Sequence, residues 1–321
     1  MGTRPSADPA LQRYNYKYRN DAQVYIRDRV LPPVTVTTRQ GHWYKRKGGH
    51  GYSVDLSDLK RASGEKYKRI VRTVERESGW FLEDYGIESA IDATDAEFAK
   101  EEGLSLREDA AEDALDEFWM ALEKAVADLV MTPANWGGNT SAILLAARWN
   151  NGGDPRTPID AAAAAIRLVT GISKRRLSLV IPEEVAEALR RNSVLAAVVQ
   201  YTSVKALYMP LALVVEALGI KEIIVGEAVY NTLEDSPAHS ETNASIWTSD
   251  KALLAWIEPN PKPGKPHGIG ATFRRKGIPA TGKMIRYNTD APPAEIVGVK
   301  TLEDIILTNT ESGWLFDTVI S

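Results

Sequence analysis

The chain of 321 residues contains no cysteine and only four histidines. The absence of cysteine excludes disulfides, cysteine–zinc sites, iron–sulfur clusters and cysteine nucleophiles, and it is compatible with a reducing compartment. The N-terminal stretch MGTRPSADPALQRYNYKYRND has no apolar core of the kind that a signal peptide needs. No apolar run reaches the length of a transmembrane helix. We therefore expect a soluble protein that is not exported by the usual route and has no membrane partner.

Sequence motifs for catalysis and metal binding are also missing. None of the histidines stands at i, i+4 beside a carboxylate on an expected helix, so there is no HExxH-type zinc motif. His42 and His50 flank a basic turn, where neighbouring cations disfavour a metal ion. The acid-rich run EDAAEDALDE (108–117) has no histidine nearby, as a di-metal helical bundle would require. A solvated helix face is the simpler interpretation of this run.

Motifs for nucleotide binding and for a catalytic nucleophile are missing as well. GIGATF (268–273) contains Gly-x-Gly, but no helix opens after it, so it is typical of a loop entering a strand. Neither a GxSxG elbow nor a P-loop is present. We therefore expect no catalytic residue, no metal site and no cofactor.

The amino-acid composition is that of a folded protein, and its charged residues are unevenly distributed along the chain. Apolar residues make up 44% of the chain, enough for a core in one large domain or two. The net charge of −4 argues against a dedicated nucleic-acid binder. Residues 41–76, however, carry ten Lys/Arg against four Asp/Glu, and residues 77–132 carry seventeen acids against three bases. This asymmetry is information about partners.

The basic segment predicts a long hairpin. WYKRK and YSVDL flank the turn signal GGHG, and EKYKRIVRTVER is strand-like. Because neither arm has a fully apolar face, we expect the hairpin to lie on another surface. Trp43, Tyr44 and Tyr52 beside Lys45, Arg46 and Lys47 could instead stack nucleic-acid bases, and that alternative stays open at this point.

Residues outside the hairpin predict an arm, a long helix and an α/β region. Residues 1–30 are expected to be an extended arm, and VLPPVTVTT (30–38) is expected to be a strand. Ser105 to Glu108 fits a capping box that opens a helix to about Met131, stopped by Thr132-Pro133. Helices and buried strands then alternate. We expect helices at 158–170, ending at Gly171, and at 182–191, 195–201 and 210–219. We expect strands at 177–182, within 221–230 and at 252–259, and two C-terminal strands around a turn at 309–313.

Several of these segments, taken in order, resemble tailed-bacteriophage major capsid proteins. The first are VLPPVTVTTRQGHWYKRK, LKRASGEKYKRI and SGWFLEDYGIESAIDATD. They are followed by TPANWGGNTSAILLAARWNNGGDPRTPIDAAAAAIRLVTG and LSLVIPEEVAEALRRN, and then by IIVGEAVYNT, ASIWTSDKALLAWIEPNP and GIGATFRRKG. The resemblance spans roughly residues 25–275. It depends mainly on the order in which the segments occur along the chain.

The resemblance implies an α+β fold, the phage major capsid fold of the Hong Kong ninety-seven type. It implies an N-terminal arm, an extended β-hairpin loop, a peripheral domain with a long spine helix, and an α/β axial domain. The implied divisions are 1–30 for the arm, 31–94 for the extended loop, 95–155 for the peripheral domain with the spine helix at 105–131, 156–250 for the axial domain, and 251–321 for C-terminal strands that return to the peripheral domain.

The function implied by the resemblance is that of a coat protein rather than an enzyme. Copies would assemble through pentamers and hexamers into an icosahedral virion shell, built in the host cytoplasm, which encloses double-stranded DNA without reading its sequence. The extended loop would then contact a neighbouring subunit. Its expected contact residues are Trp43, Tyr44, Lys45, Arg46, Lys47, His50, Tyr52, Lys66, Lys68, Arg69 and Arg72.

Two further sets of residues receive expected roles. An acidic face of the spine helix would point to the interior and repel packaged DNA; its members are Glu108, Glu112, Asp116 and Glu123. Glycine pairs would act as hinges between the different subunit environments and during shell expansion; they are Gly137, Gly138, Gly152 and Gly153.

Candidate partners, besides other copies of the chain, are scaffolding, portal and decoration proteins. Because no scaffold-like segment precedes the arm, we expect a separate scaffolding protein or none. Lys45, Lys47 and Asn309 are of the types that cross-link in some members of the family, but no motif fixes them, so we expect no covalent cross-link. The alternatives are an encapsulin-type compartment shell, a nucleic-acid-binding protein using the basic hairpin, and, ranked last, an enzyme on the α/β region.

Overall fold

The structure is a computed structural model. It describes residues 24–46, 60, 74–92, 94, 97–98, 106–199, 208–232, 243–262, 268–279, 281–290 and 293–321. The α-helices in these ranges are α2 (Arg27–Val30), α4 (Leu106–Met131), α5 (Arg156–Thr170), α6 (Glu183–Arg190), α7 (Ser193–Val199) and α8 (Leu211–Leu218). The short 3-10 helices are η3 (Pro133–Trp136), η4 (Leu145–Ala147), η5 (Trp149–Asn151), η6 (Lys174–Arg176) and η8 (Thr310–Ser312).

The strands fall into two larger sheets and two small ribbons. The strands before α5 are β1 (Pro33–Val36), β2 (Gln40–Arg46), β3 (Val74–Phe81), β4 (Glu83–Asp92) and β5 (Thr140–Ala142). The strands after it are β6 (Ser178–Pro182), β7 (Glu222–Gly226), β8 (Val229–Asn231), β9 (Asn243–Ser245), β10 (Ala252–Ala255), β11 (Gly270–Arg275), β12 (Lys283–Asp290), β13 (Pro293–Leu307) and β14 (Gly313–Asp317).

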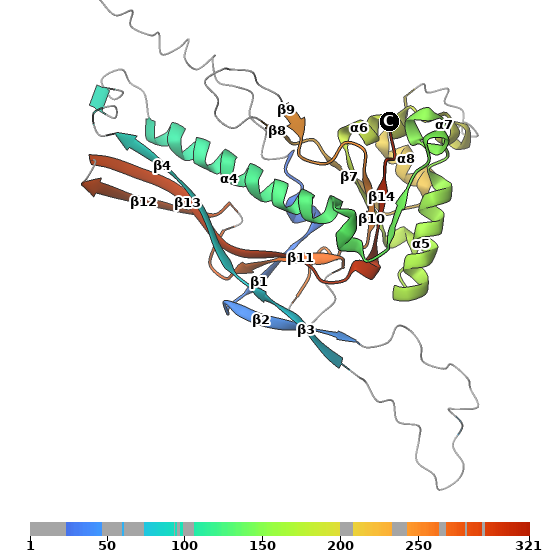
Figure 1. The fold of residues 1–321 in the computed structure, drawn as a ribbon, viewed down its shortest axis with the longest axis horizontal. Helices are drawn as coiled ribbons and strands as arrows, with labels where there is room; N and C mark the ends of the chain where they lie inside the picture. The colour runs from blue at the N-terminus through green and yellow to red at the C-terminus, as the bar shows by residue number, and fades with distance from the viewer. Residues whose placement is uncertain are drawn as a thin grey trace, which may run out of the picture.

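The first larger sheet, here called the extended sheet, is organised around the fifteen-residue strand β13. Its order is β1-β11-β13-β12, and β4 pairs with β13 as well. Helix α4 contacts β13 and β4 and lies along this sheet, as Figure 1 shows. Phe118 and Leu122 of α4 pack on Val299 of β13. The first half of the helix and the extended sheet therefore support each other.

The second larger sheet, here called the compact sheet, is covered on both faces. Its order is β5-β14-β10-β6-β7. Helices α5 to α8 pack on one face, against residues such as Leu179 and Leu254 (Figure 1). The other face packs on the C-terminal half of α4 and on the N-terminal segment, through Val180 and Leu253. Strands β6 and β10 are buried throughout, as expected of strands covered on both faces.

The two small ribbons lie outside these sheets. Strands β2 and β3 pair antiparallel from Gln40↔Phe81 to Arg46↔Val74, with a register shift between His42 and Tyr44. This β2–β3 ribbon projects from the extended sheet beside β1, away from the tips of β4, β12 and β13 (Figure 1). Strands β8 and β9 form a second short antiparallel pair.

Most of the expected elements are confirmed. The long helix runs over Leu106–Met131, and α5 ends at Gly171, which has the left-handed backbone of a C-cap at φ 74°. The strand expected at 177–182 is β6, and the loop before β11 enters a strand as expected. Ser105 lies outside the described residues, so the capping box is not observed.

Other expectations need correction. Residues 27–30 form the helical turn α2 rather than an extended arm, while residues 1–23 lie outside the described ranges. Strand β2 pairs with Val74–Phe81; YSVDL (52–56), its expected partner, lies outside the described ranges. Strand β12 was not foreseen. The two C-terminal strands belong to different sheets, β13 to the extended one and β14 to the compact one.

A buried asparagine fixes the chain where it enters the helical layer. The side-chain amide of Asn192 donates to the carbonyl oxygens of Trp149 (2.8 Å) and Gly153 (2.9 Å). Its Oδ1 accepts from the backbone N–H groups of Val194 and Leu195, both at 3.0 Å, at the start of α7. One side chain therefore caps a helix and satisfies two buried carbonyls in a distant turn.

We predict that Asn192→Ala lowers the free energy of unfolding by about 3 kcal/mol, because a helix cap and two buried hydrogen bonds are lost together. Chemical denaturation of the full-length chain measures this. Asn135→Ala is the control, since Asn135 makes one hydrogen bond at an exposed position, and its effect should stay within about 0.5 kcal/mol. Equal effects of the two variants would contradict the assigned role of Asn192.

Candidate intersubunit surfaces

The base of the β2–β3 ribbon is anchored on its own chain by three aromatic rings. Trp80 stacks on Phe273 of β11 with ring centroids 4.9 Å apart, and Trp43 stacks on the same ring at 6.0 Å. Trp43 is only 9% exposed. The irregular pairing around Trp43 is the kind of bulge that re-aims a side chain. A Cβ on Gly41 would lie 2.1 Å from the Trp80 ring, so only glycine leaves room for the stack.

This anchor corrects two expectations. The ribbon does have an apolar face at its base, and Trp43, expected to contact a neighbouring subunit, is buried within its own chain. The backbones of Tyr44, Lys45 and Arg46 lie in β2, opposite β3. The other expected contact residues, Lys47, His50, Tyr52, Lys66, Lys68, Arg69 and Arg72, lie outside the described residues.

The expected acidic face of α4 is only partly on the surface. Glu108 and Glu112 are exposed and Asp116 is half-buried, but Glu123 is completely buried. The buried side of α4 turns along its length, because its first half packs on the extended sheet and its last half packs on the compact sheet. Glu123 lies in the second half, so the same helical face that is in water at Glu108 is covered there.

Glu123 instead holds three elements together. Its Oε1 accepts from the backbone N–H of Ile26 (3.0 Å) and from the indole Nε1 of Trp247 (2.8 Å), and its Oε2 accepts from the backbone N–H of Arg27 (2.9 Å). Ile26 and Arg27 begin α2, whose first N–H groups have no partner within the helix. A carboxylate 97 positions away therefore does the work of a helix cap.

Burial raises the pKa of Glu123, while the hydrogen bonds from Ile26, Arg27 and Trp247 and the charge of Arg27 act in the opposite direction. A linked network lies next to it. Glu303, fully buried on β13, binds Arg27 (2.9 Å) and Arg274 of β11 (3.0 Å). The N-terminal segment is thus fixed to the extended sheet by a buried ion pair and to α4 by the hydrogen bonds to Glu123.

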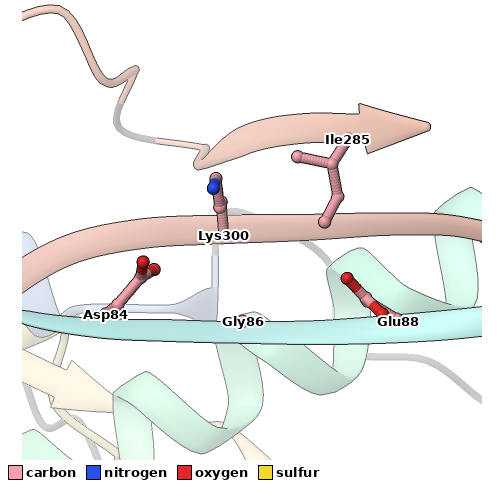
Figure 2. A pocket seen from close by; sticks show the side chains of 5 residues that line it. All are labelled: Asp84, Gly86, Glu88, Ile285 and Lys300. Atoms are coloured by element: carbon pink, nitrogen blue, oxygen red, sulfur yellow. The ribbon is translucent and has the colours of Figure 1, made fainter. Parts of the chain in front are cut away.

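A hollow on the open face of the extended sheet was not foreseen. Figure 2 shows Asp84 and Glu88 of β4 and Lys300 of β13 around it, with Ile285 on β12. Its volume is about 430 Å³. Gly86 stands directly opposite Lys300 in the register, so no side chain fills the floor there. A glycine inside a strand pattern marks such close approaches and was the available signal.

This hollow contains charged groups but no nucleophile paired with a base. The hydroxyl of Tyr287 donates to Glu88 at 2.8 Å, which turns one carboxylate toward β12. Within the described ranges, no group of three or more His, Cys, Asp or Glu is arranged to hold a metal ion. No helix among the described residues is long and apolar enough to cross a membrane. The hollow is therefore lined by two carboxylates and one ammonium group.

The expected hinge glycines have two different environments. Gly137, Gly138 and Gly152 have positive φ, and a Cβ would meet nothing within 4 Å. Gly153 is packed: a Cβ there would lie 2.0 Å from the carbonyl oxygen of Ala147. Any hinge role therefore suits Gly137, Gly138 and Gly152 better than Gly153.

The comparison at sequence level points to phage capsids. The chain is 28% identical, over 292 residues, to the major capsid protein of Burkholderia phage BcepMu, covering 87% of this chain and 86% of that protein. No family model matches the sequence. The resemblance to phage major capsid proteins seen in the sequence is confirmed.

Solved structures establish the fold. A phage-related protein from Bordetella bronchiseptica RB50 superposes with a TM-score of 0.67 at 20% identity, covering 97% of each chain. The capsid of cyanophage P-SCSP1u gives 0.54 at 12% identity, covering 89% of this chain and 85% of that one. The holo-SrpI encapsulin from Synechococcus elongatus PCC 7942 also gives 0.54, at 10% identity, covering 100% and 98%. The expected α+β capsid fold is therefore confirmed.

We predict that Glu123→Leu lowers the free energy of unfolding by about 3 kcal/mol or more, because three buried N–H donors lose their acceptor. Denaturation of the full-length chain measures this, with Glu117→Leu at an exposed position of the same helix as the control. If both variants had the same stability, Glu123 would not be the anchor of the N-terminal segment.

The stability difference between the native chain and Glu123→Leu should also depend on pH. Because burial raises the folded-state pKa of Glu123 above its ordinary value of 4.5, the folded chain binds a proton more readily than the unfolded one. The native chain's advantage over Glu123→Leu should therefore be largest at low pH and fall as pH rises through the folded-state pKa. Denaturation midpoints of both proteins between about pH 4 and pH 8 measure this; an advantage that grows with pH would contradict it.

Proposed function

We propose that this chain is the major capsid protein of a tailed double-stranded DNA bacteriophage, assembling into the virion shell. The observation that carries the proposal is the sequence similarity to a phage major capsid protein over 87% of the chain. The capsid fold supports it independently. A shell protein needs shape and contact area, and the open face of the extended sheet presents charged side chains.

An encapsulin-type shell is the second candidate, because an encapsulin superposes as well as the cyanophage capsid does. Both of those likenesses lie near 10% identity and speak for the fold alone. The similarity at 28% identity is to a phage protein, which favours the phage shell. A nucleic-acid-binding monomer ranks third, since the anchored base of the ribbon uses its aromatic rings within the chain.

In the proposed shell, the β2–β3 ribbon and the basic sequence 47–73 that joins its strands reach a neighbouring subunit. The base stays fixed by Trp43 and Trp80, so the ribbon leaves its own chain in a set direction. The open face of the extended sheet, where Asp84 and Glu88 outnumber Lys300, would be the receiving surface. Exposed ion pairs contribute about 0–1 kcal/mol each, so many weak pairs repeated over the shell would act together.

The remaining roles in the proposed shell follow from exposure. Glu108 and Glu112 are exposed and Asp116 is half-buried on α4, and this face would turn toward the packaged DNA and keep it from adhering. Gly137, Gly138 and Gly152 would absorb the differences between pentamer and hexamer environments. Residues 251–321 contribute strands to both larger sheets and would join the peripheral and axial domains. Scaffolding, portal and decoration proteins would be partners, and assembly would take place in the host cytoplasm.

Assembly of the purified chain tests the proposal. Sedimentation and negative-stain microscopy, at low and high salt, should show pentamers, hexamers or closed shells. A monomer of 35.3 kDa that binds DNA with steep salt dependence would favour a nucleic-acid-binding protein and overturn the proposed capsid function.

The ribbon's role has its own test. Changing Lys47, Lys66, Lys68, Arg69 and Arg72 to Ser should lower the yield of closed shells roughly tenfold, since losing several weak contacts removes more than about 1.4 kcal/mol per interface. The thermal midpoint should stay unchanged, because the anchor at Trp43 and Trp80 is untouched. As a control, five exposed Lys or Arg of the compact-sheet body are changed to Ser. An equal yield from the ribbon variant and the native chain would contradict the proposal.

A further inference from the structure

Helix α5 has apolar residues on both of its faces. Its inner face is buried against the compact sheet. Its outward face contains Ala161, Ala164 and Leu168, all exposed, and Leu168 is 84% exposed. The exposed side also contains Asp160 and Arg167, so Ala161, Ala164 and Leu168 form an apolar stripe between charged residues. Figure 1 shows α5 at the outer edge of the helical layer, so the outward face lacks a cover from the described chain.

A second exposed apolar surface lies on the same body. Leu144, Leu145, Ala146 and Ala147 are four consecutive exposed apolar residues, with Leu144 at 79% and Leu145 at 63%. We call this run the leucine turn. A run of this kind on a surface is unusual unless it has a partner.

The leucine turn is held firmly. The backbone N–H of Ile143, just before it, donates to the carbonyl of Asp317 at 2.9 Å. The carbonyl of Ala147, at its end, lies so close to Gly153 that no Cβ fits between them. The two leucines are therefore presented on a fixed support rather than on a loose loop, which lowers the entropy lost on binding.

The two surfaces point in different directions. The leucine turn directly follows β5, the edge strand of the compact sheet. Helix α5 instead covers one face of that sheet, over β10 and β14. A contact that joins two different surfaces on each copy is head-to-tail, and such contacts close into rings when the rotation between copies allows it.

Charge and shape complement each other across such a contact. The protruding leucines match the small side chains of Ala161 and Ala164. Arg148 directly follows the leucine turn and is half-buried, with its Nε atom covered by its own chain. Asp160 lies beside the outward face of α5 with its side chain 60% exposed, paired with Lys174. A cation thus flanks one surface and an exposed carboxylate flanks the other.

We propose that the leucine turn of one copy docks on the outward face of α5 of a second copy, with Leu144 and Leu145 over Ala161 and Ala164 and with Arg148 beside Asp160. This inference rests on the proposed function, since it names the contact that joins neighbouring subunits around a pentamer or hexamer. It assigns that contact to leucine and alanine side chains that are exposed in the single chain.

The absence of native cysteine allows a direct test by disulfide cross-linking. The full-length double variant Leu145→Cys/Ala164→Cys, oxidised after assembly, should give a ladder of covalent oligomers reaching five or six chains on non-reducing gels. Each single variant should remain a monomer on the same gel, because a head-to-tail contact does not bring identical positions together. Leu145→Cys paired with Glu117→Cys on α4 is the control and should give no ladder.

A disruption variant gives a second measurement. Leu145→Asp should lower the yield of rings and shells roughly tenfold, because a charge would enter an apolar contact. Its thermal midpoint should be unchanged, since Leu145 is exposed in the single chain. Native yield from this variant would overturn the docking assignment.

The cross-linking outcomes also separate this inference from the proposed function. Rings or shells without a ladder would overturn the docking contact alone. Cross-linked dimers from Ala164→Cys by itself would show that α5 meets another α5, which also overturns it. A chain that stays monomeric and gives no ladder would overturn both the contact and the shell function.

Discussion

The structure depends on one buried carboxylate, that of Glu123 on α4. It accepts hydrogen bonds from Ile26 and Arg27 of the N-terminal segment and from Trp247 beside the compact sheet. Removing a carboxylate from water is costly unless its oxygens are fully satisfied. Here the donors come from two segments far apart in sequence, so the cost is offset only when the N-terminal segment, α4 and the compact sheet are all in place.

The other links in the body follow from this junction. Arg27, positioned by Glu123, also binds Glu303, and Glu303 binds Arg274, so the extended sheet is joined to the same segment. Trp247 packs so closely on Gly226 of β7 that a Cβ would lie 2.2 Å from its ring. The body is therefore rigid at its centre, and the surfaces left for other molecules are peripheral: the ribbon, the open face of the extended sheet, α5 and the leucine turn.

The sequence was sufficient to predict those helices and strands that are determined by neighbouring residues. Helical periodicity and Thr132-Pro133 gave α4 to within one residue, and Gly171 ended α5 as its lack of a side chain suggests. Contacts between residues far apart in the sequence could not be predicted from it. Glu123 shares a helical face with Glu108, and nothing in the spacing reveals that Trp247 and Ile26 cover only one of them. Trp43 was expected to contact a neighbouring subunit because the ring that covers it, Phe273, lies 230 positions away in the sequence. The membership of β13 and β14 in different sheets likewise depends on pairing partners that local patterns do not specify.

We propose that this chain forms a shell from copies of itself, with the ribbon lying on a neighbour and the Glu123 junction intact within each copy. A cryo-electron microscopy reconstruction of particles assembled from the purified chain tests it most directly. We expect rings of five and six subunits in a closed shell, with density for residues 47–73 crossing onto the adjacent subunit. Particles in which that segment folds back on its own chain, or a preparation that yields only monomers, would contradict it.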